Sequence, residues 1–147
     1  HDVRELVHEA CEMFRGQADQ SSIHLDEVPP EEPARVRCDR DRMLQVFSNL
    51  ISNALKFTPE QGTVRVAATC DETSMRGEVS DTGSGIPGAQ LPHLFDRFWQ
   101  AQARRDTAGL GLYITRGILV ARGADLAVES TVGKGSTFSF TLPLIAS

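Results

Sequence analysis

The 147-residue sequence lacks several features that would assign it to a common functional class. It has only three cysteines, Cys11, Cys38 and Cys70, which are widely separated and never in CxxC spacing. They are expected to be small core residues of a reduced, cytoplasmic protein, and neither a disulfide framework nor a zinc site is predicted. Positive charge is in deficit, because 15 Lys and Arg residues stand against 20 Asp and Glu, a net charge of −5. This balance argues against binding to nucleic acid or to an anionic membrane as the main activity.

Long apolar runs are absent as well, and none approaches the roughly 20 residues that a membrane span requires. Hydrophobic residues nevertheless make up 40% of the chain, which is enough for a core and too much for a disordered protein. The length fits one compact domain. The chain begins at His1 rather than at a methionine, with no signal sequence before it, so we expect a piece of a longer protein.

Helical and strand patterns are intermixed along the chain without strict alternation. Helices are predicted at 3–20, from an N-cap at Asp39 to Phe57, at 91–98, and at 110–122 with Gly123 as C′ residue. Strands are predicted at 23–28, around Val36, and at 63–69, 76–80, 126–130 and 137–142. The polar stretch 100–108 has no hydrophobic period and is expected to be mobile. The mixture predicts an α/β fold: a two-layer sandwich of a mixed β-sheet with helices on one face.

The helix that ends at Phe57 has an unusual polar face. Opposite its apolar side, an arc of roughly 80° carries Gln45, Asn49, Asn53 and Lys56. A solvated face usually consists of Glu, Lys and Arg, and asparagine is a poor helix former. Amide oxygens can ligate a hard cation and an ammonium group can hold phosphate, so this face, on the side away from the core, is a candidate binding surface.

Two glycine-containing segments are the next candidates. In the first, a predicted strand ends at Asp81 and the backbone continues through Gly83 and Gly85. This segment suits an ordinary turn. Alternatively, the glycines let a ligand approach the backbone closely while the Asp81 carboxylate accepts a hydrogen bond from a ligand amine. In the second, Gly109 and Gly111 lie at the start of a helix, where free N–H groups and the helix dipole favour an anion. The second segment matches neither a GxGxxG motif nor a Walker loop.

In this order, the motifs resemble the nucleotide-binding boxes of sensor histidine kinases. The resembling segments are 45–58 (N box), 81–86 (G1 box), 94–98 (F box), 109–112 (G2 box) and the last glycine motif at 133–138. The resemblance implies the Bergerat, or GHKL, fold shared with DNA gyrase and Hsp90. It further implies an ATP-binding catalytic domain that transfers the γ-phosphoryl group of ATP to a histidine on a dimerisation domain absent from this sequence.

Roles for individual residues follow from the same resemblance. Asp81 is expected to bind the adenine amine, Asn53 to ligate Mg²⁺ with Asn49 beside it, and Lys56 to contact phosphate. Asn49, Lys56 and Arg97 are the expected catalytic residues. Further contacts to the nucleotide are expected from Gly83, Gly85, Ile86, Phe98, Gly109, Leu110, Gly111, Leu112 and Ser136. Residues 1–22 would join the dimerisation domain, and about 98–109 would form the ATP lid.

Asn49 distinguishes between branches of this superfamily. Water-splitting relatives carry a glutamate, which acts as a base, four residues before the metal asparagine. In this sequence Asn49 stands at that position, and an amide cannot take a proton near neutral pH. A neutral imidazole already presents a lone pair, so Asn49 favours histidine as the phosphoryl acceptor. Two alternatives remain: an ATP-gated clamp or hydrolase of the same fold, or a degenerate interaction module, for which Thr107 in place of the usual first glycine is the only hint.

The expected partners follow from the kinase hypothesis. None of the four histidines, His1, His8, His24 and His93, lies in a phosphoacceptor motif, so the chain is expected to bind Mg-ATP without phosphorylating itself. The expected partners are the dimerisation domain of the same protein and the receiver domain of a response regulator. The parent is expected to be a homodimer, with no nucleic acid partner and no direct membrane contact from this domain, whether or not the parent is membrane-anchored.

Overall fold

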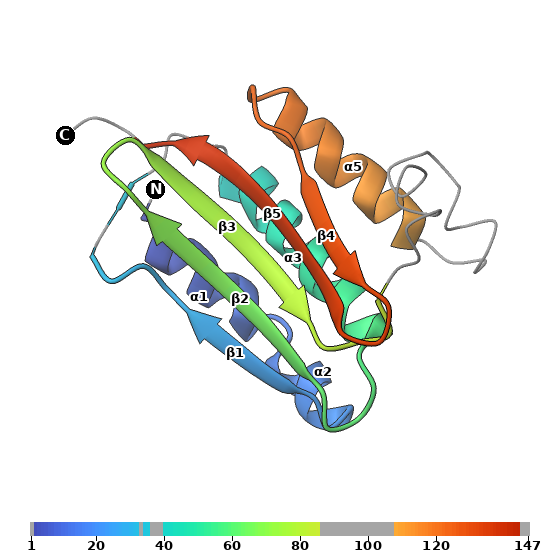
Figure 1. Ribbon diagram of the computed structural model, residues 1–147. Coiled ribbons are helices and arrows are strands. Elements are labelled where there is room, and N and C mark those ends of the chain that lie inside the picture. The colour runs from blue at the N-terminus through green and yellow to red at the C-terminus, as the bar shows by residue number, and fades with distance from the viewer. Residues whose placement is uncertain (1, 33, 36–39, 86–107, 145–147) are drawn as a thin grey trace.

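The computed structural model describes residues 2–32, 34–35, 40–85 and 108–144 (Figure 1). Its centre is a five-stranded sheet with the strand order β1-β2-β3-β5-β4. The strands are β1 (His24–Val28), β2 (Thr63–Cys70), β3 (Ser74–Asp81), β4 (Ala127–Thr131) and β5 (Gly135–Pro143). β1 runs parallel to β2, and all the other neighbours are antiparallel, so the sheet is mixed as predicted.

The described helices form the second layer. They are α1 (Val3–Glu12), α2 (Arg15–Gln20), α3 (Arg40–Phe57) and α5 (Ala108–Val120). Figure 1 shows α1 and α3 behind the sheet, and α5 packs against α3 next to the β4 edge, which confirms the predicted two-layer α/β sandwich. The predicted strand around Val36, the N-cap Asp39 and the helix at 91–98 lie outside the described residues. In the part of the chain that is described, no helix is long and apolar enough to cross a bilayer.

The core lies between these two layers. The apolar side of α3 is buried as the helical spacing predicts, and the Phe47 ring meets the Phe140 ring of β5 edge-on at a centroid distance of 5.4 Å. Gly77 lies opposite Phe140 in the β3–β5 register, and a Cβ at Gly77 would lie 2.5 Å from that ring. The glycine therefore makes room for the aromatic side chain that joins the layers.

Of the predicted helix ends, one differs from the structure and one agrees with it. The single helix predicted at 3–20 is wrong, because the chain turns at Met13 and Phe14 and a second helix starts at Arg15. The C′ residue predicted at Gly123 is confirmed. Its φ is +80°, and the Gly123 and Ala124 N–H groups bond the Val120 and Leu119 carbonyls, which is a Schellman motif.

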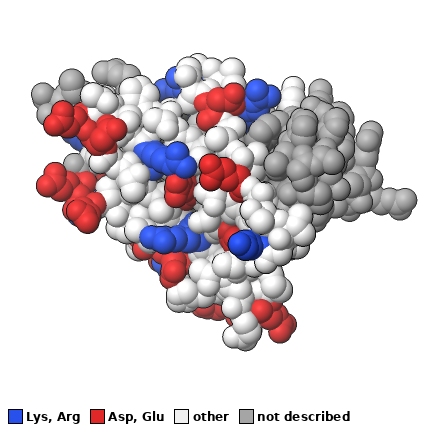
Figure 2. Space-filling view, viewed as in Figure 1, with Lys and Arg blue, Asp and Glu red and all other residues white. Residues whose placement is uncertain are grey.

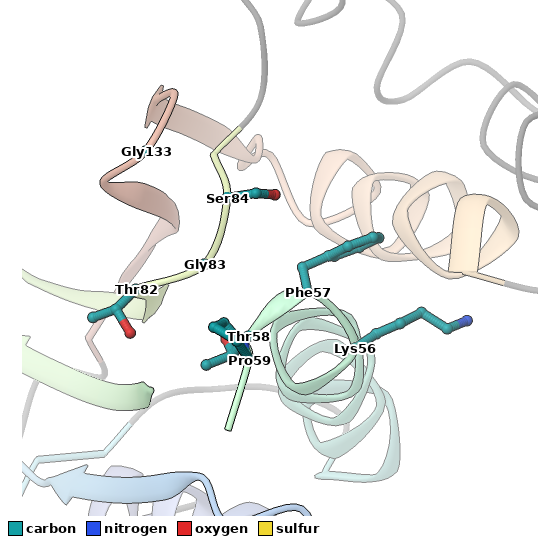
Figure 3. A pocket seen from close by; sticks show the side chains of 8 residues that line it. All are labelled: Lys56, Phe57, Thr58, Pro59, Thr82, Gly83, Ser84 and Gly133. Atoms are coloured by element: carbon teal, nitrogen blue, oxygen red, sulfur yellow. The ribbon is translucent and has the colours of Figure 1, made fainter. Parts of the chain in front are cut away.

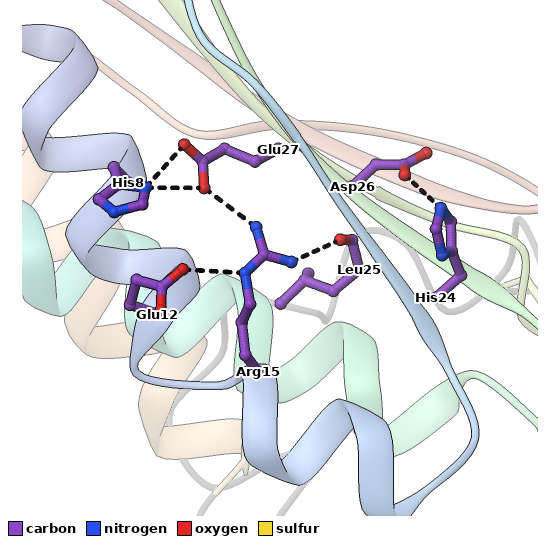
Figure 4. Close-up of polar contacts among 7 residues, drawn as sticks. All are labelled: His8, Glu12, Arg15, His24, Leu25, Asp26 and Glu27. Atoms are coloured by element: carbon purple, nitrogen blue, oxygen red, sulfur yellow. Dashed lines mark hydrogen bonds and ion pairs between the residues drawn. The ribbon is translucent and has the colours of Figure 1, made fainter.

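Arg15, the first residue of α2, bonds groups on α1 and on β1. Its guanidinium donates to the Leu25 carbonyl at 3.0 Å and pairs with Glu12 at 3.0 Å and Glu27 at 3.1 Å (Figure 4). His8 reaches the same Glu27 carboxylate at 3.1 Å. The imidazole and the two carboxylates lie close enough together to suit a metal ion, but the guanidinium already bridges both carboxylates. Arg15 is thus the cation of this cluster, which fastens α1 and α2 to β1.

Charges of both signs cover the sheet face seen in Figure 2. Blue and red side chains are interspersed there and do not gather into a patch of one sign. Arg76 and Glu78, two residues apart on β3, form an ion pair at 2.7 Å.

The described cysteines agree with the prediction of core residues, since Cys11 is buried and Cys70 is half-buried. Burial raises the pKa of Cys11 to about 12.

Candidate functional site

Asn49 and Asn53 lie one turn apart on α3, on the side that faces α5. Asn49 is half-buried, and its Nδ2 donates to Oγ1 of Thr115 on α5 at 3.1 Å. Asn53 is only 6% exposed. The sequence pattern placed Asn53 away from the core, and that part of the prediction is wrong because Asn53 is buried. α5 packs against α3 and contacts it at Asn49.

The Asn53 side chain carries an unusual buried atom. Its Oδ1 is buried, and no described residue donates a hydrogen bond to it. A buried oxygen without a partner costs free energy, roughly 1–3 kcal/mol, unless a donor or a cation satisfies it. An amide oxygen is a suitable ligand for a hard cation such as Mg²⁺. The donor set that the structure presents here therefore fits the metal that the resemblance implies.

Asp81 ends β3 as a buried carboxylate. It lies opposite Ser136 in the β3–β5 register, and its Oδ1 accepts the Gly83 N–H at 2.8 Å. Burial raises the pKa of Asp81 above its ordinary value, while the backbone N–H groups of Gly83 and Ser136 oppose that rise. An ionised carboxylate accepts about four hydrogen bonds, so Asp81 can accept another from a ligand amine.

The glycines after Asp81 are required by contacts within the protein. A Cβ on Gly83 would lie 2.4 Å from the Phe57 carbonyl oxygen at the end of α3. Gly85 has a φ of +76°, and a Cβ there would lie 2.2 Å from the Thr131 carbonyl oxygen. The sequence pattern left open an ordinary turn or a close approach of a ligand, and the structure shows a close approach of the loop to α3 and to the end of β4.

Residues predicted from separate motifs line one hollow of about 420 Å³ at the end of α3 (Figure 3). Its lining consists of Lys56, Phe57, Thr58, Pro59, Thr82, Gly83, Ser84 and Gly133. Figure 3 shows Lys56 and Phe57 projecting on one side of the last turn of α3, with Thr58 and Pro59 on the other. Lys56 and the glycine loop thus line the same hollow, with the Lys56 side chain extending away from the loop in Figure 3.

The remaining predicted residues are only partly described. Gly109, Leu110 and Gly111 lie in the first turn of α5, where helix geometry leaves the N–H groups without intrahelical acceptors. Leu112 is buried, and Ser136 is buried with its Oγ 2.8 Å from Ser130 Oγ. Ile86, Arg97 and Phe98 lie outside the described residues, as do Thr107 and most of the predicted lid.

Sequence reasoning missed Thr115. This hydroxyl is fully buried on the inward side of α5, yet it donates or accepts a hydrogen bond with one of the predicted site residues, Asn49. The available signal was its helical spacing, because Thr115 lies three residues after Leu112 and four before Leu119, which are both buried.

Comparison with known proteins identifies the family. The model of the histidine kinase-, DNA gyrase B- and HSP90-like ATPases matches residues 38–146. The chain belongs to this family. It is 36% identical over 147 residues to the histidine protein kinase DivJ of Caulobacter vibrioides, covering 98% of this chain and 25% of that protein. It is 38% identical over 120 residues to the sensor histidine kinase WalK of Bacillus subtilis, covering 78% of this chain and 20% of that protein.

Solved structures agree with this membership and with the Bergerat fold. The catalytic domain of histidine kinase ThkA superposes with a TM-score of 0.83 at 26% identity, covering 97% of this chain and 94% of that one. Full-length ShkA in complex with AMPPNP gives a TM-score of 0.88 at 28% identity, covering 100% of this chain and 31% of that one. The chain spans about a quarter of DivJ and a fifth of WalK.

Proposed function

We propose that this chain is the ATP-binding catalytic domain of a two-component sensor histidine kinase. Its ATPase family and its likeness to named histidine kinases support this proposal. The γ-phosphoryl group of bound ATP would pass to a histidine on a dimerisation domain of the same protein. From there it would pass to the receiver domain of a response regulator.

The nucleotide is held in this proposal by groups on three elements. Asp81 accepts a hydrogen bond from the adenine amine in a buried environment where water competes poorly. The N–H groups in the first turn of α5 and the Lys56 ammonium hold the phosphates. Leu112 and Ser136 border the nucleotide, and Arg97 contacts the γ-phosphate.

Asn53, with Asn49 beside it, holds Mg²⁺ in this proposal. The unpartnered buried Oδ1 of Asn53 supports this assignment. When bound, the ion neutralises charge on the phosphate oxygens, and phosphoryl transfer depends chiefly on such positioning and charge stabilisation.

The observation that supports a kinase over a hydrolase is the amide at Asn49. It occupies the position at which a water-activating relative needs a carboxylate base, and its Nδ2 is engaged by Thr115. An amide takes no proton near neutral pH, so activation of water has no base at this position. A neutral imidazole needs no such base, because it attacks through an existing lone pair.

Residues 1–22 join this domain to the dimerisation domain in this proposal, and about 98–109 form the lid over ATP. The parent protein acts as a homodimer.

The experiment that tests the proposal is incubation of this chain with ATP labelled in the γ-phosphate, first alone and then with the parent's dimerisation domain. The chain alone should remain unlabelled, and the dimerisation domain should gain acid-labile, alkali-stable phosphohistidine. Steady-state release of labelled phosphate without phosphohistidine would contradict the proposal and favour the hydrolase.

A further inference from the structure

Strand β3 departs from regular pairing with β2 at the residue after Asp81. Val64 and Asp81 form the last pair of the β2–β3 register, so Thr63 and Thr82 would form the next one. The Thr82 N–H donates to the Thr63 carbonyl at 3.1 Å, as a regular antiparallel pair requires. The return bond differs, because the Thr63 N–H donates to the side-chain Oγ1 of Thr82 at 2.9 Å.

The hydroxyl group of Thr82 thus takes the place of its own main-chain oxygen in the ladder. The direction of the bond is fixed, since a backbone N–H only donates and Oγ1 must accept. Thr82 is exposed, so packing in the core does not decide which side chain stands here. Figure 3 shows it where the glycine loop begins, across the hollow from Thr58 and Pro59.

This exchange of oxygens releases the peptide unit between Thr82 and Gly83. The C=O and N–H groups of a trans peptide point in opposite directions within one plane. If the Thr82 carbonyl pointed at β2, the Gly83 N–H would lie in the plane of the sheet and point away from β2. The Asp81 side chain projects from the face of the sheet, so that N–H would not be directed at it. In the structure, the Gly83 N–H donates to Asp81 Oδ1 at 2.8 Å.

The bond from Gly83 bears on the nucleotide site because it holds the Asp81 carboxylate. The Gly83 N–H favours the ionised form and opposes the rise in the pKa of Asp81 that burial causes. An ionised carboxylate only accepts hydrogen bonds, and the amine of adenine donates them. A site built around such a bond discriminates against a base that lacks the amine.

We infer that Thr82 is a positioning residue for adenine selectivity. Its hydroxyl group replaces the main-chain oxygen in the β2–β3 ladder, and the released peptide turns the Gly83 N–H to hold the Asp81 carboxylate toward the base amine. This inference rests on the proposed function and adds to it a residue to which the sequence motifs gave no role. Thr82 acts through Gly83 and Asp81 rather than by contact with the base.

Two substitutions separate the hydroxyl group from the rest of the side chain. Thr82→Val keeps the branched shape and removes the acceptor, whereas Thr82→Ser keeps the acceptor. The measurement is calorimetric affinity for ADP and for purine riboside 5′-diphosphate, which has hydrogen in place of the adenine amine. The ratio of the two dissociation constants measures adenine selectivity. We expect wild type to prefer ADP, Thr82→Val to lose roughly fivefold of that preference, the scale of one hydrogen bond, and Thr82→Ser to keep it.

A merely structural role would give a different pattern. General loosening of the loop would weaken both nucleotides together and leave the ratio at its wild-type value, and this result in Thr82→Val would overturn the inference. Thr69→Val, at another exposed position of β2, is the matched control and should keep the wild-type ratio. An equal loss of preference in Thr69→Val would also overturn the inference.

A second readout follows the Gly83 hydrogen bond itself. In the nucleotide-free chain, the Gly83 amide signal in a ¹⁵N spectrum should shift in Thr82→Val, and its proton should exchange with solvent faster. Both should stay close to wild type in Thr82→Ser. An unchanged Gly83 amide in Thr82→Val would overturn the inference, because the peptide would then keep its direction without the hydroxyl group.

The same titrations distinguish this inference from the proposed function. A wild-type chain that binds neither nucleotide would contradict the proposed function and the inference together. A wild type that binds both nucleotides equally would overturn the inference and the role of Asp81, with nucleotide binding retained. A wild-type preference for ADP that Thr82→Val leaves intact would overturn the inference alone.

Discussion

Gly83 lies so close to the carbonyl oxygen of Phe57 that a Cβ at Gly83 would be only 2.4 Å from it. The loop after β3 is therefore seated directly on the C-terminal end of α3. This contact joins the element that carries Asp81 to the element that carries Asn49 and Asn53, so the spacing between the two parts of the site depends on a residue without a side chain.

Gly83→Ala should accordingly destabilise the protein by about 1–3 kcal/mol, because the backbone atoms that the new methyl group meets cannot move aside without shifting α3 or the loop. Affinity for ADP should fall as well. Urea unfolding and calorimetry check these effects. The matched control is Gly117→Ala on α5, where nothing lies within 4 Å, and which should stabilise the helix by about 0.5–1 kcal/mol. Equal stability changes in the two variants would contradict the proposed contact.

Asp81→Asn should abolish most of the affinity for ATP and ADP alike without lowering stability. The raised pKa means that the fold favours the protonated carboxyl group, so the wild-type chain loses stability as the pH rises from the ordinary aspartate pKa through the raised one. The asparagine variant lacks this titration. Its stability relative to wild type should therefore increase over that pH interval and then level off. Chemical unfolding at several pH values tests this, and a variant that is less stable than wild type at neutral pH would contradict it.

Asn53→Ala should remove the dependence of nucleotide affinity on Mg²⁺ and leave the fold intact. Although Asn53 is buried, the substitution deletes a buried oxygen without a partner, and this gain should offset much of the lost packing. The free energy of unfolding should change by no more than about 1 kcal/mol. Ser52→Ala, at the exposed neighbouring position of α3, is the control and should behave as wild type. Retention of the full Mg²⁺ effect in Asn53→Ala would disprove the metal assignment.

Arg15→Ala should lower stability by about 1 kcal/mol and leave nucleotide affinity unchanged. The guanidinium holds two carboxylates and one carbonyl, but it is partly exposed to solvent, which screens the ion pairs. Part of the loss should disappear at high salt. Arg65→Ala, on an exposed position of β2, is the comparison and should have a smaller effect. A weakened affinity for ADP in the Arg15 variant would show that the α1–α2–β1 cluster acts on the site.

The sequence predicted much of the fold because its periodic patterns are strong. The apolar side of α3 and the Schellman end of α5 both follow from local spacing and a glycine. The break before Arg15 was not predicted, because Phe14 and Ala18 continue the helical period across it.

Within the site, residue types could be predicted but their surroundings could not. The amides of α3 were recognisable because asparagine is rare on a solvated helical face. A helical wheel contains no information about the elements that pack around a helix, however, so the burial of Asn53 was not predictable. Thr115 was missed for the same reason, since its partner Asn49 is 66 residues away in sequence.

The central claim is that a nucleotide lies between the amide face of α3 and the loop after β3, with Mg²⁺ on the amides. Calorimetric titration of ADP, with and without Mg²⁺, into wild type, Asn53→Ala and Asp81→Asn tests it most directly. The account predicts that wild type binds ADP more tightly with Mg²⁺, that Asn53→Ala binds ADP without this gain, and that Asp81→Asn binds poorly in both conditions. Three identical titration curves, or no saturable binding to wild type, would contradict it.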